Sequence, residues 1–224
     1  MSAWDRNWDR IYETQGYRAK YPGEELVRFI AHLYNPLPEK EKGKIKILEV
    51  GCGPGANIWY LAREGFSVYG IDGSKAAIKM CKERLNKEGL SAKLTVGDMV
   101  KLPYHEEFFQ VVVDNFSIQH NIPYNIEHML SEAHRVLGKD GILFSAVLST
   151  KHYLFGRGKA LARNSYLDVA DGALRGVGIT HFFTIPEIRR IYGKRFVGIN
   201  IEYIERTIGN MASIIASYII TARK

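Results

Sequence analysis

A glycine-rich loop follows the first strand-like run of the chain. The residues Glu49-Val50-Gly51-Cys52-Gly53-Pro54-Gly55 stand between the apolar run 45–50 and a helical pattern. Glycines permit the tight turn that such a crossover needs, and they let the backbone and the N–H groups of the helix N-terminus approach a ligand. Asp72 follows Gly53 by nineteen residues, at the end of the next predicted strand. A carboxylate there can accept hydrogen bonds from both ribose hydroxyls of an adenosine-type ligand.

The same loop also fits a different ligand. The spacing Gly51-x-Gly53-x-x-Ala56 matches the fingerprint of dinucleotide-binding proteins, so an NAD-dependent oxidoreductase is one alternative. The charge of Glu49, however, suits a cationic group better than a pyrophosphate. After the third predicted strand, the Asp98-Met99 pair offers a polar acceptor for the edge of an adenine and an apolar side chain for its face.

Strand-like runs alternate with helical stripes from residue 44 onward. The pattern predicts strands at 45–50, 67–71, 94–96, 109–113 and 142–148, and helices at 56–64, 74–87 and 126–137. Such alternation indicates βαβ units, and therefore a doubly wound α/β fold with a mostly parallel sheet. A further helix is expected after the capping box that begins at Thr184. Two β-rich runs, 196–204 and 213–221, predict a C-terminal antiparallel hairpin that brings the sheet to seven strands.

Five segments of the chain together resemble one known family, the class I (Rossmann-like) S-adenosylmethionine-dependent methyltransferases, in their small single-domain branch. The segments read LEVGCGPG (48–55), VYGIDGS (68–74), VGDMVKLP (96–103), FQVVVDNFSIQHN (109–121) and HRVLGKDGILF (134–144). The resemblance runs from residue 45 to 149 and more loosely to the end. It implies that S-adenosyl-L-methionine is the cofactor and S-adenosyl-L-homocysteine the product. One departure is Gly73, because many members carry a bulkier residue after the ribose-binding acid.

The resemblance also implies a role for individual residues. Three glycines face the methionine half of the cofactor, Asp72 binds the ribose, Asp98 and Met99 hold the adenine, and residues 115–120 meet the methyl group and the acceptor. Trp4, Trp8 and Tyr12, at helical spacing, could close over the cofactor, since aromatic faces are favourable neighbours of a sulfonium cation. The predicted cofactor-binding residues are Trp8, Tyr12, Gly51, Gly53, Gly55, Asp72, Gly73, Ser74, Asp98, Met99, Asn115 and Phe116.

Methyl transfer from a sulfonium needs mainly alignment and exclusion of water, so it does not demand a dedicated base. If the nucleophile is a hydroxyl, a histidine is the natural general base. His120 and His181 are the predicted catalytic residues, the first following the fourth strand and the second preceding Thr184. The strand exit Asp114-Asn115-Phe116-Ser117 lacks the Asn/Asp-Pro-Pro-Tyr signature of enzymes that methylate exocyclic base nitrogens.

A single domain spanning 1–224 is expected, with an N-terminal helical arm at 1–43, a cofactor-binding core at 44–149, a substrate lid at 150–181 and a C-terminal helix and hairpin at 182–224. The lid is a glycine-punctuated, irregular stretch. Its basic residues are Lys151, Arg157, Lys159, Arg163 and Arg175, interleaved with Tyr153, Phe155 and Tyr166. This composition favours an acceptor bearing a carboxylate or phosphate, although an RNA-binding lid would use the same residue types.

Composition adds weaker constraints. The 224 residues are 46% hydrophobic and 25% charged, which is typical of one globular domain, and the net charge of +7 is spread along the chain. The sequence has no apolar run of about 18 residues, no signal-peptide pattern and no metal-ligand spacing. We therefore expect a cytoplasmic monomer or homodimer, with no membrane or metal partner, that methylates an oxygen or nitrogen of a small anionic metabolite. The alternatives are a tRNA or rRNA methyltransferase and a non-catalytic S-adenosylmethionine-binding protein.

Overall fold

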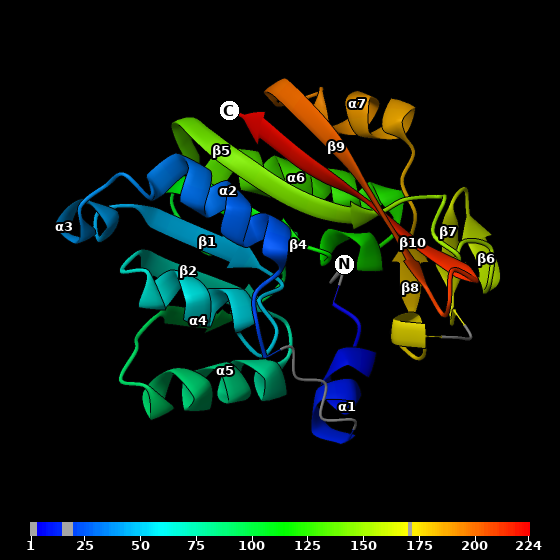
Figure 1. The fold of residues 1–224 in the computed structure, drawn as a ribbon, viewed down its shortest axis with the longest axis horizontal. Coiled ribbons are helices and arrows are strands. Elements are labelled where there is room, and N and C mark those ends of the chain that lie inside the picture. The colour runs from blue at the N-terminus through cyan, green and yellow to red at the C-terminus, as the bar shows by residue number, and fades with distance from the viewer. Residues whose placement is uncertain (1–3, 15–19, 170–171) are drawn as a thin grey trace.

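A seven-stranded sheet forms the centre of the computed structural model, which describes residues 4–14, 20–169 and 172–224 (Figure 1). The strand order is β3-β2-β1-β4-β5-β10-β9. The pairs from β3 to β5 are parallel, whereas β10 is antiparallel to both β5 and β9. The bounds are β1 Lys46–Val50, β2 Ser67–Asp72, β3 Lys93–Val96, β4 Phe109–Asn115, β5 Leu137–Leu148, β9 Val197–Ile208 and β10 Ser213–Arg223. The predicted mostly parallel sheet with a C-terminal antiparallel hairpin is confirmed.

Helices cover both faces of this sheet. Successive strand residues point to opposite faces, so Ile47 packs in the cluster with α2, α4 and α5, while Leu48 packs in the cluster with α6 and α7. The helices are α1 Asn7–Thr14, α2 Glu24–Tyr34, α3 Glu39–Lys42, α4 Ala56–Arg63, α5 Lys75–Lys87, α6 Pro123–Val136 and α7 Ile185–Tyr192, with 3-10 turns η1 Ile118–His120 and η2 Gly172–Leu174. Within the described ranges, no helix has the length and apolar composition needed to cross a bilayer.

Two predicted helix starts carry their caps. Ser74 accepts a hydrogen bond from the Ala77 N–H at 3.1 Å and begins α5, and Thr184 accepts one from the Glu187 N–H at 3.4 Å and begins α7. Each side chain satisfies one of the N–H groups that a helix leaves free in its first turn. The Glu187 carboxylate lies against His181, at 3.2 Å.

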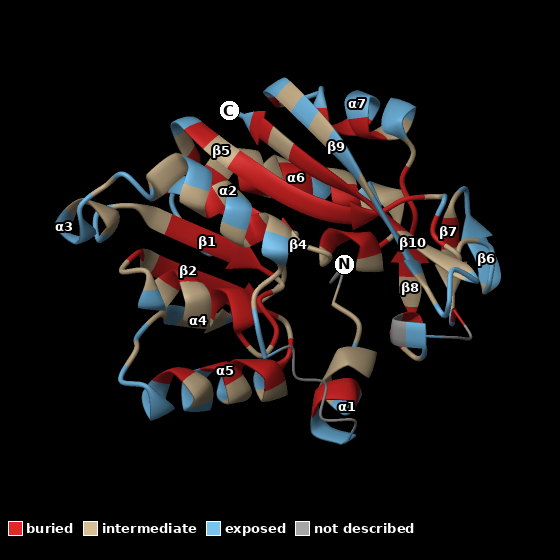
Figure 2. Ribbon diagram, viewed as in Figure 1, coloured by how far each residue is buried: buried red, intermediate tan, exposed pale blue. Residues whose placement is uncertain are grey.

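The prediction that the lid is irregular is wrong in one respect, because the segment contains a small three-stranded antiparallel sheet. Its strands are β6 Lys159–Ala162, β7 Ser165–Leu167 and β8 Ile179–His181. Asn164, at φ +59°, makes the turn between the first two. Rings of Phe155, Tyr166 and Phe182 pack edge to face beneath it. Residues 170–171 of the predicted lid lie outside the described residues. In Figure 2 the outer strand β6 is exposed, whereas β7 and β8 are buried or half-buried.

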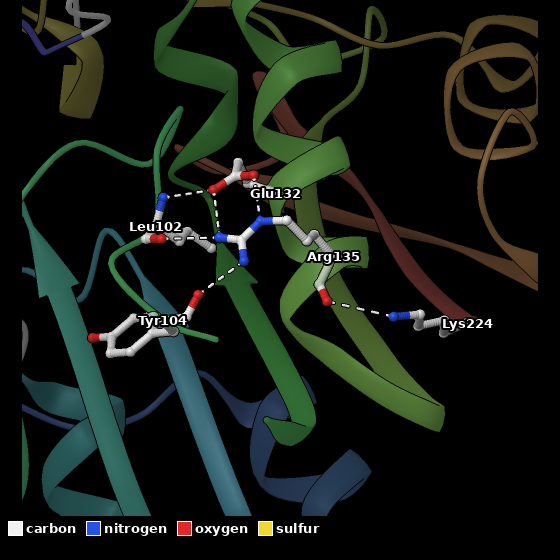
Figure 3. A network of polar contacts seen from close by, with 5 residues as sticks. All are labelled: Leu102, Tyr104, Glu132, Arg135 and Lys224. Carbon is white, nitrogen blue, oxygen red and sulfur yellow. Dashed lines mark hydrogen bonds and ion pairs between the residues drawn. The ribbon is translucent and has the colours of Figure 1, made fainter. Parts of the chain in front are cut away.

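A polar network fixes the loop that follows β3 (Figure 3). Glu132 and Arg135 of α6 form an ion pair at 2.7 Å. The Glu132 carboxylate accepts the Leu102 N–H, and the Arg135 guanidinium donates to the carbonyls of Leu102 and Tyr104 at 2.9 and 2.8 Å. The C-terminal Lys224 donates to the carbonyl of Arg135 at 3.4 Å. The loop that begins with Asp98 and Met99 is thereby tied to α6.

Candidate active site

A cavity of about 420 Å³ opens at the C-terminal ends of β1, β2 and β4. This is the crevice at the switch point of the strand order, where open α/β sheets bind ligands. In Figure 1, α1 lies between α5 and the small sheet. Eleven of the fourteen predicted site residues line the cavity: Trp8, Tyr12, Gly51, Gly53, Asp72, Gly73, Asp98, Met99, Asn115, Phe116 and His120. Gly55, Ser74 and His181 do not.

The glycine loop lies beneath the cavity with its backbone exposed to it. Gly51 and Gly53 have φ values of +65° and +50°, which side-chain-bearing residues rarely adopt, and a Cβ on Gly53 would lie 3.0 Å from the Tyr12 hydroxyl. Gly55, at φ +81°, has another task. A Cβ there would overlap the Cys81 thiol, so this glycine lets α4 pack against α5.

Asp72 is held at the end of β2 by the loop itself. Its Oδ2 accepts the Gly53 N–H and its Oδ1 accepts the Ser74 N–H, each at 2.8 Å. Burial raises the pKa of Asp72 to about 6, although these two hydrogen bonds act in the opposite direction. Ser74 lies behind this carboxylate and donates its hydroxyl proton to Asp9 of α1 at 2.5 Å. Its side chain thus anchors the N-terminal segment.

Glu49, at the end of β1, is a buried carboxylate on the cavity wall. It is 3% exposed, and its Oε1 accepts the Asn57 amide N–H at 2.6 Å. Its Oε2 makes no hydrogen bond within the described residues. Burial raises the pKa of Glu49 to about 8. A buried acid with a free acceptor atom is a favourable site for a cationic ligand group.

Asp98 lies just after β3, at the same edge of the sheet as the glycine loop. Its Oδ1 accepts the Val100 N–H at 3.1 Å, and its Oδ2 accepts the backbone N–H of Trp4 at 3.2 Å. Met99 lies beside the glycine loop, with its Sδ 3.5 Å from the position of a Cβ on Gly51. The N-terminal segment therefore reaches the residues predicted to hold the adenine.

The helix α1 closes one side of the cavity. Its Trp8 stacks on Tyr12 with ring centroids 5.8 Å apart, and it meets the His120 ring edge to face at 4.9 Å. Ile11 is buried in a hydrophobic cluster with Leu154, Leu174 and Val177 of the predicted lid. Of the three aromatic residues predicted at helical spacing, Trp8 and Tyr12 lie on α1 and contact η1 and the glycine loop respectively, whereas Trp4 precedes the helix.

His120, at the end of η1, has its tautomer set by its neighbours. The ring Nδ1 lies 3.1 Å from the Ile179 carbonyl, which can only accept, so Nδ1 carries the proton and Nε2 keeps a lone pair. Gln119 accepts the Leu148 N–H at 2.8 Å and thereby turns its amide NH₂ toward this Nε2, at 3.4 Å. Burial lowers the pKa of His120 to about 4. The imidazole is therefore neutral at pH 7 and can accept a proton.

Asp114 fixes the turn that carries this histidine. The carboxylate, 1% exposed, accepts the N–H groups of Ser117 and Ile118 at 2.9 and 3.0 Å and the Ser145 hydroxyl at 2.6 Å. Ser145 in turn contacts the Tyr192 hydroxyl at 2.8 Å. Burial raises the pKa of Asp114 to about 6. These bonds hold the exit of β4 in one conformation.

His181 lies away from the cavity. It ends β8 and is fully buried between β7 and α7, where its Nδ1 contacts the Ser165 hydroxyl at 2.8 Å and its Nε2 lies 3.2 Å from Glu187. The structure therefore does not bring the two predicted histidines together. The side chain joins the small sheet to the helix that follows it.

The sequence reading did not single out His152, which lines the cavity from the lid. It is 7% exposed, and its Nδ1 accepts the Leu154 N–H at 3.1 Å, so its Nε2 carries the proton. Burial lowers its pKa as well. Of the five basic lid residues, Arg175 lies at the cavity. No motif marks His152, whose ring is placed by its hydrogen bond with Leu154 and by contacts with the rings of Tyr153 and Phe182.

Residues 47–141 match the family model described as a methyltransferase domain. Over these residues the chain carries a methyltransferase domain, and S-adenosylmethionine-dependent methyltransferases share its fold. Among curated methyltransferases, it is 29% identical over 158 residues to a ubiquinone biosynthesis O-methyltransferase of Pelagibacter ubique, a match that covers 68% of this chain and 62% of the relative. It is 31% identical over 144 residues to a fatty-acid O-methyltransferase of Mycolicibacterium smegmatis, covering 59% and 51%. The chain thus spans about three fifths of the length of the first relative and about half of the second.

Solved methyltransferases share the fold. A methyltransferase of Methanosarcina mazei superposes with a TM-score of 0.68 at 24% identity, covering 86% of this chain and 96% of that one. The 1,6-didemethyltoxoflavin-N1-methyltransferase of Burkholderia thailandensis, solved with its acceptor and S-adenosylhomocysteine, gives a TM-score of 0.63 at 19% identity and covers 88% of this chain and 75% of that one. At these identities the likeness concerns the fold.

Proposed function

We propose that this methyltransferase transfers the methyl group of S-adenosylmethionine to a hydroxyl of a small, mostly apolar acceptor, with His120 as general base. The observation that carries the proposal is the neutral His120 imidazole on the cavity wall, with its proton on Nδ1 and its lone pair on Nε2. An amine acceptor would need no such group if it were already unprotonated.

The cavity residues fit the cofactor on three counts. The orphaned Oε2 of Glu49 matches the α-ammonium of the methionine portion, which would also favour the ionised acid. The backbone of Gly51 and Gly53 leaves room for a ligand against the loop. Asp72 offers carboxylate oxygens for the ribose, and Asp98 offers one for the adenine amino group.

When bound, S-adenosylmethionine supplies an activated methyl group that an acceptor can take in one in-line displacement. The chain contributes positioning and proton handling. His120 Nε2 accepts the hydroxyl proton of the acceptor in place of the long contact, 3.4 Å, that the Gln119 amide makes to it, while the Ile179 carbonyl stabilises the imidazolium through Nδ1. Trp8 and the other walls exclude water from this end of the cavity.

The acceptor end is mostly apolar with a few polar groups. Its apolar lining comprises Ile11, Phe116, Leu148, Leu154, Leu174, Val177 and Ile215. The Nε2–H of His152 can donate to a carbonyl or ether oxygen of the acceptor, and Arg175 can bind one carboxylate at the mouth. We therefore propose a hydroxylated acceptor with an apolar body and at most one acidic group. Transfer to an oxygen also agrees with the names of the two O-methyltransferase relatives.

The test is turnover with S-adenosylhomocysteine release as the readout. The acceptor panel contains hydroxylated aromatic acids, their neutral analogues, fatty acids, primary amines and bulk transfer RNA. We expect turnover with hydroxylated small molecules. Methylation of RNA alone, or binding of S-adenosylmethionine without turnover on any acceptor, would instead support the RNA methyltransferase or the non-catalytic binding protein.

A further inference from the structure

We infer that the indole of Trp4 forms one wall of the adenine-binding end of the cavity, in the place that a side chain at position 73 would otherwise fill. This inference rests on the proposed function, because it assigns a contact within the same cofactor site. It concerns a residue far in sequence from the strands that supply the rest of the site.

The first observation is the close approach of Trp4 to Gly73. A Cβ built on Gly73 would overlap Cε3 and Cδ2 of the indole, so the six-membered half of the ring lies directly on this glycine. The φ of Gly73 is not in the left-handed region, which means that its backbone conformation does not require glycine. The neighbouring ring is what requires the absence of a side chain.

The second observation is that the segment around this ring is anchored on both sides. The Trp4 N–H donates to Asp98 Oδ2 at 3.2 Å, and Asp9 accepts the Ser74 hydroxyl proton at 2.5 Å. These contacts place the half-buried indole at the cavity, beside Gly73 at the end of β2 and Asp98 just after β3.

A flat aromatic wall next to a carboxylate suits a purine. Bases stack favourably on aromatic side chains, and each carboxylate oxygen can accept more than one hydrogen bond, so Asp98 can bind an amino group while it holds Trp4. Gly73 and Trp4 thus act as a pair: position 73 carries no side chain, and the ring of Trp4 from the N-terminal segment fills that space.

The test is calorimetric titration of S-adenosylhomocysteine and of adenosine into the full chain. Trp4→Ala should weaken the binding of both ligands about 5- to 100-fold, since the lost contact is with the adenine base. Trp4→Phe, which keeps a ring, should stay within about threefold to fivefold of the wild type. Trp59→Ala, which removes an indole outside the cavity, is the matched control and should change neither affinity.

A rescue variant separates the wall from a general loss of structure. Gly73→Leu in the intact chain should weaken binding, because the new side chain would clash with the indole. In the Trp4→Ala background the same change should restore part of the affinity. Unchanged or tighter binding by Trp4→Ala, or no rescue in the double variant, would overturn the inference. Failure of the wild type to bind S-adenosylhomocysteine would overturn the proposed function itself.

Discussion

The Asn57 amide donates to Oε1 of Glu49 at 2.6 Å and leaves Oε2 of the same buried carboxylate without a partner in the described part of the chain. Glu49 is thus half satisfied by the protein. Its pKa of about 8 reflects the cost of keeping the ionised form away from water. Ionisation of this carboxyl is therefore unfavourable in the unliganded protein, and a cationic ligand group can offset that cost.

Glu49→Gln should lower the affinity for the ligand and raise the stability of the unliganded protein. Removing the buried charge should raise the free energy of unfolding of the unliganded protein at pH 8 by roughly 1–3 kcal/mol, while S-adenosylhomocysteine binding weakens tenfold or more. Thermal melts and calorimetry measure the two effects. Glu83→Gln, an exposed change on α5, is the matched control. A variant that loses stability and keeps its affinity would contradict the role given to Glu49.

Binding should release a proton from Glu49. Between pH 4.5 and 8 the folded, unliganded protein holds a proton on Glu49 that the unfolded chain has lost, so this residue makes stability fall as pH rises through that window. A ligand ammonium favours the ionised acid, and binding at pH 7.5 should therefore expel the proton. Calorimetry in buffers of different ionisation enthalpy should detect the release in the wild type and not in Glu49→Gln.

His120→Asn should lower kcat with an acceptor by about 10²- to 10⁴-fold, because the asparagine amide can still reach the Ile179 carbonyl but offers no base. Affinity for S-adenosylhomocysteine should change little. Because the pKa of His120 is near 4, the rate should show no limb near pH 6.5 from this residue. His128→Asn, at an exposed position on α6, serves as the control. Near-normal kcat in His120→Asn would show that the reaction needs no base there.

His181→Ala should act on stability and leave the chemistry largely intact. The side chain is buried between Ser165 and Glu187, and its loss removes a polar contact from each. We expect the free energy of unfolding to fall by about 1–3 kcal/mol while kcat of the folded enzyme stays within a few-fold. Chemical denaturation and initial rates check the two parts. A large loss of kcat without loss of stability would return His181 to the reaction.

The fold was predictable because its long elements carry clear periods. The valine-rich run at β4 and the helical stripe of α6 each extend over two or more turns or pleats, so their apolar spacing is unambiguous. The strands β6, β7 and β8 have three or four residues, too few to distinguish alternation from irregular chain. Their pairing is decided by the turn at Asn164 and by the aromatic cluster beneath, which is formed from distant segments.

The site residues likewise fall into those that the sequence could place and those that it could not. Residues at strand ends, such as Asp72 and Asp98, could be placed from the sequence because the topology fixes where strands end. His181 was predicted to meet the cavity on chain position, but the pleat of β8 turns its side chain toward α7. Trp4 and His152 contribute through long-range packing that no local pattern encodes.

The central claim is that the cavity binds an adenosyl thioether, and calorimetric titration of the wild type and of Asp72→Ala with S-adenosylhomocysteine and with NAD tests it most directly. We predict saturable binding of S-adenosylhomocysteine by the wild type and no binding of NAD. In Asp72→Ala the binding free energy of S-adenosylhomocysteine should fall by about 1.5–3 kcal/mol, because the charge-assisted hydrogen bonds are missing. Equal affinity in the two proteins, or binding of NAD in place of S-adenosylhomocysteine, would contradict it.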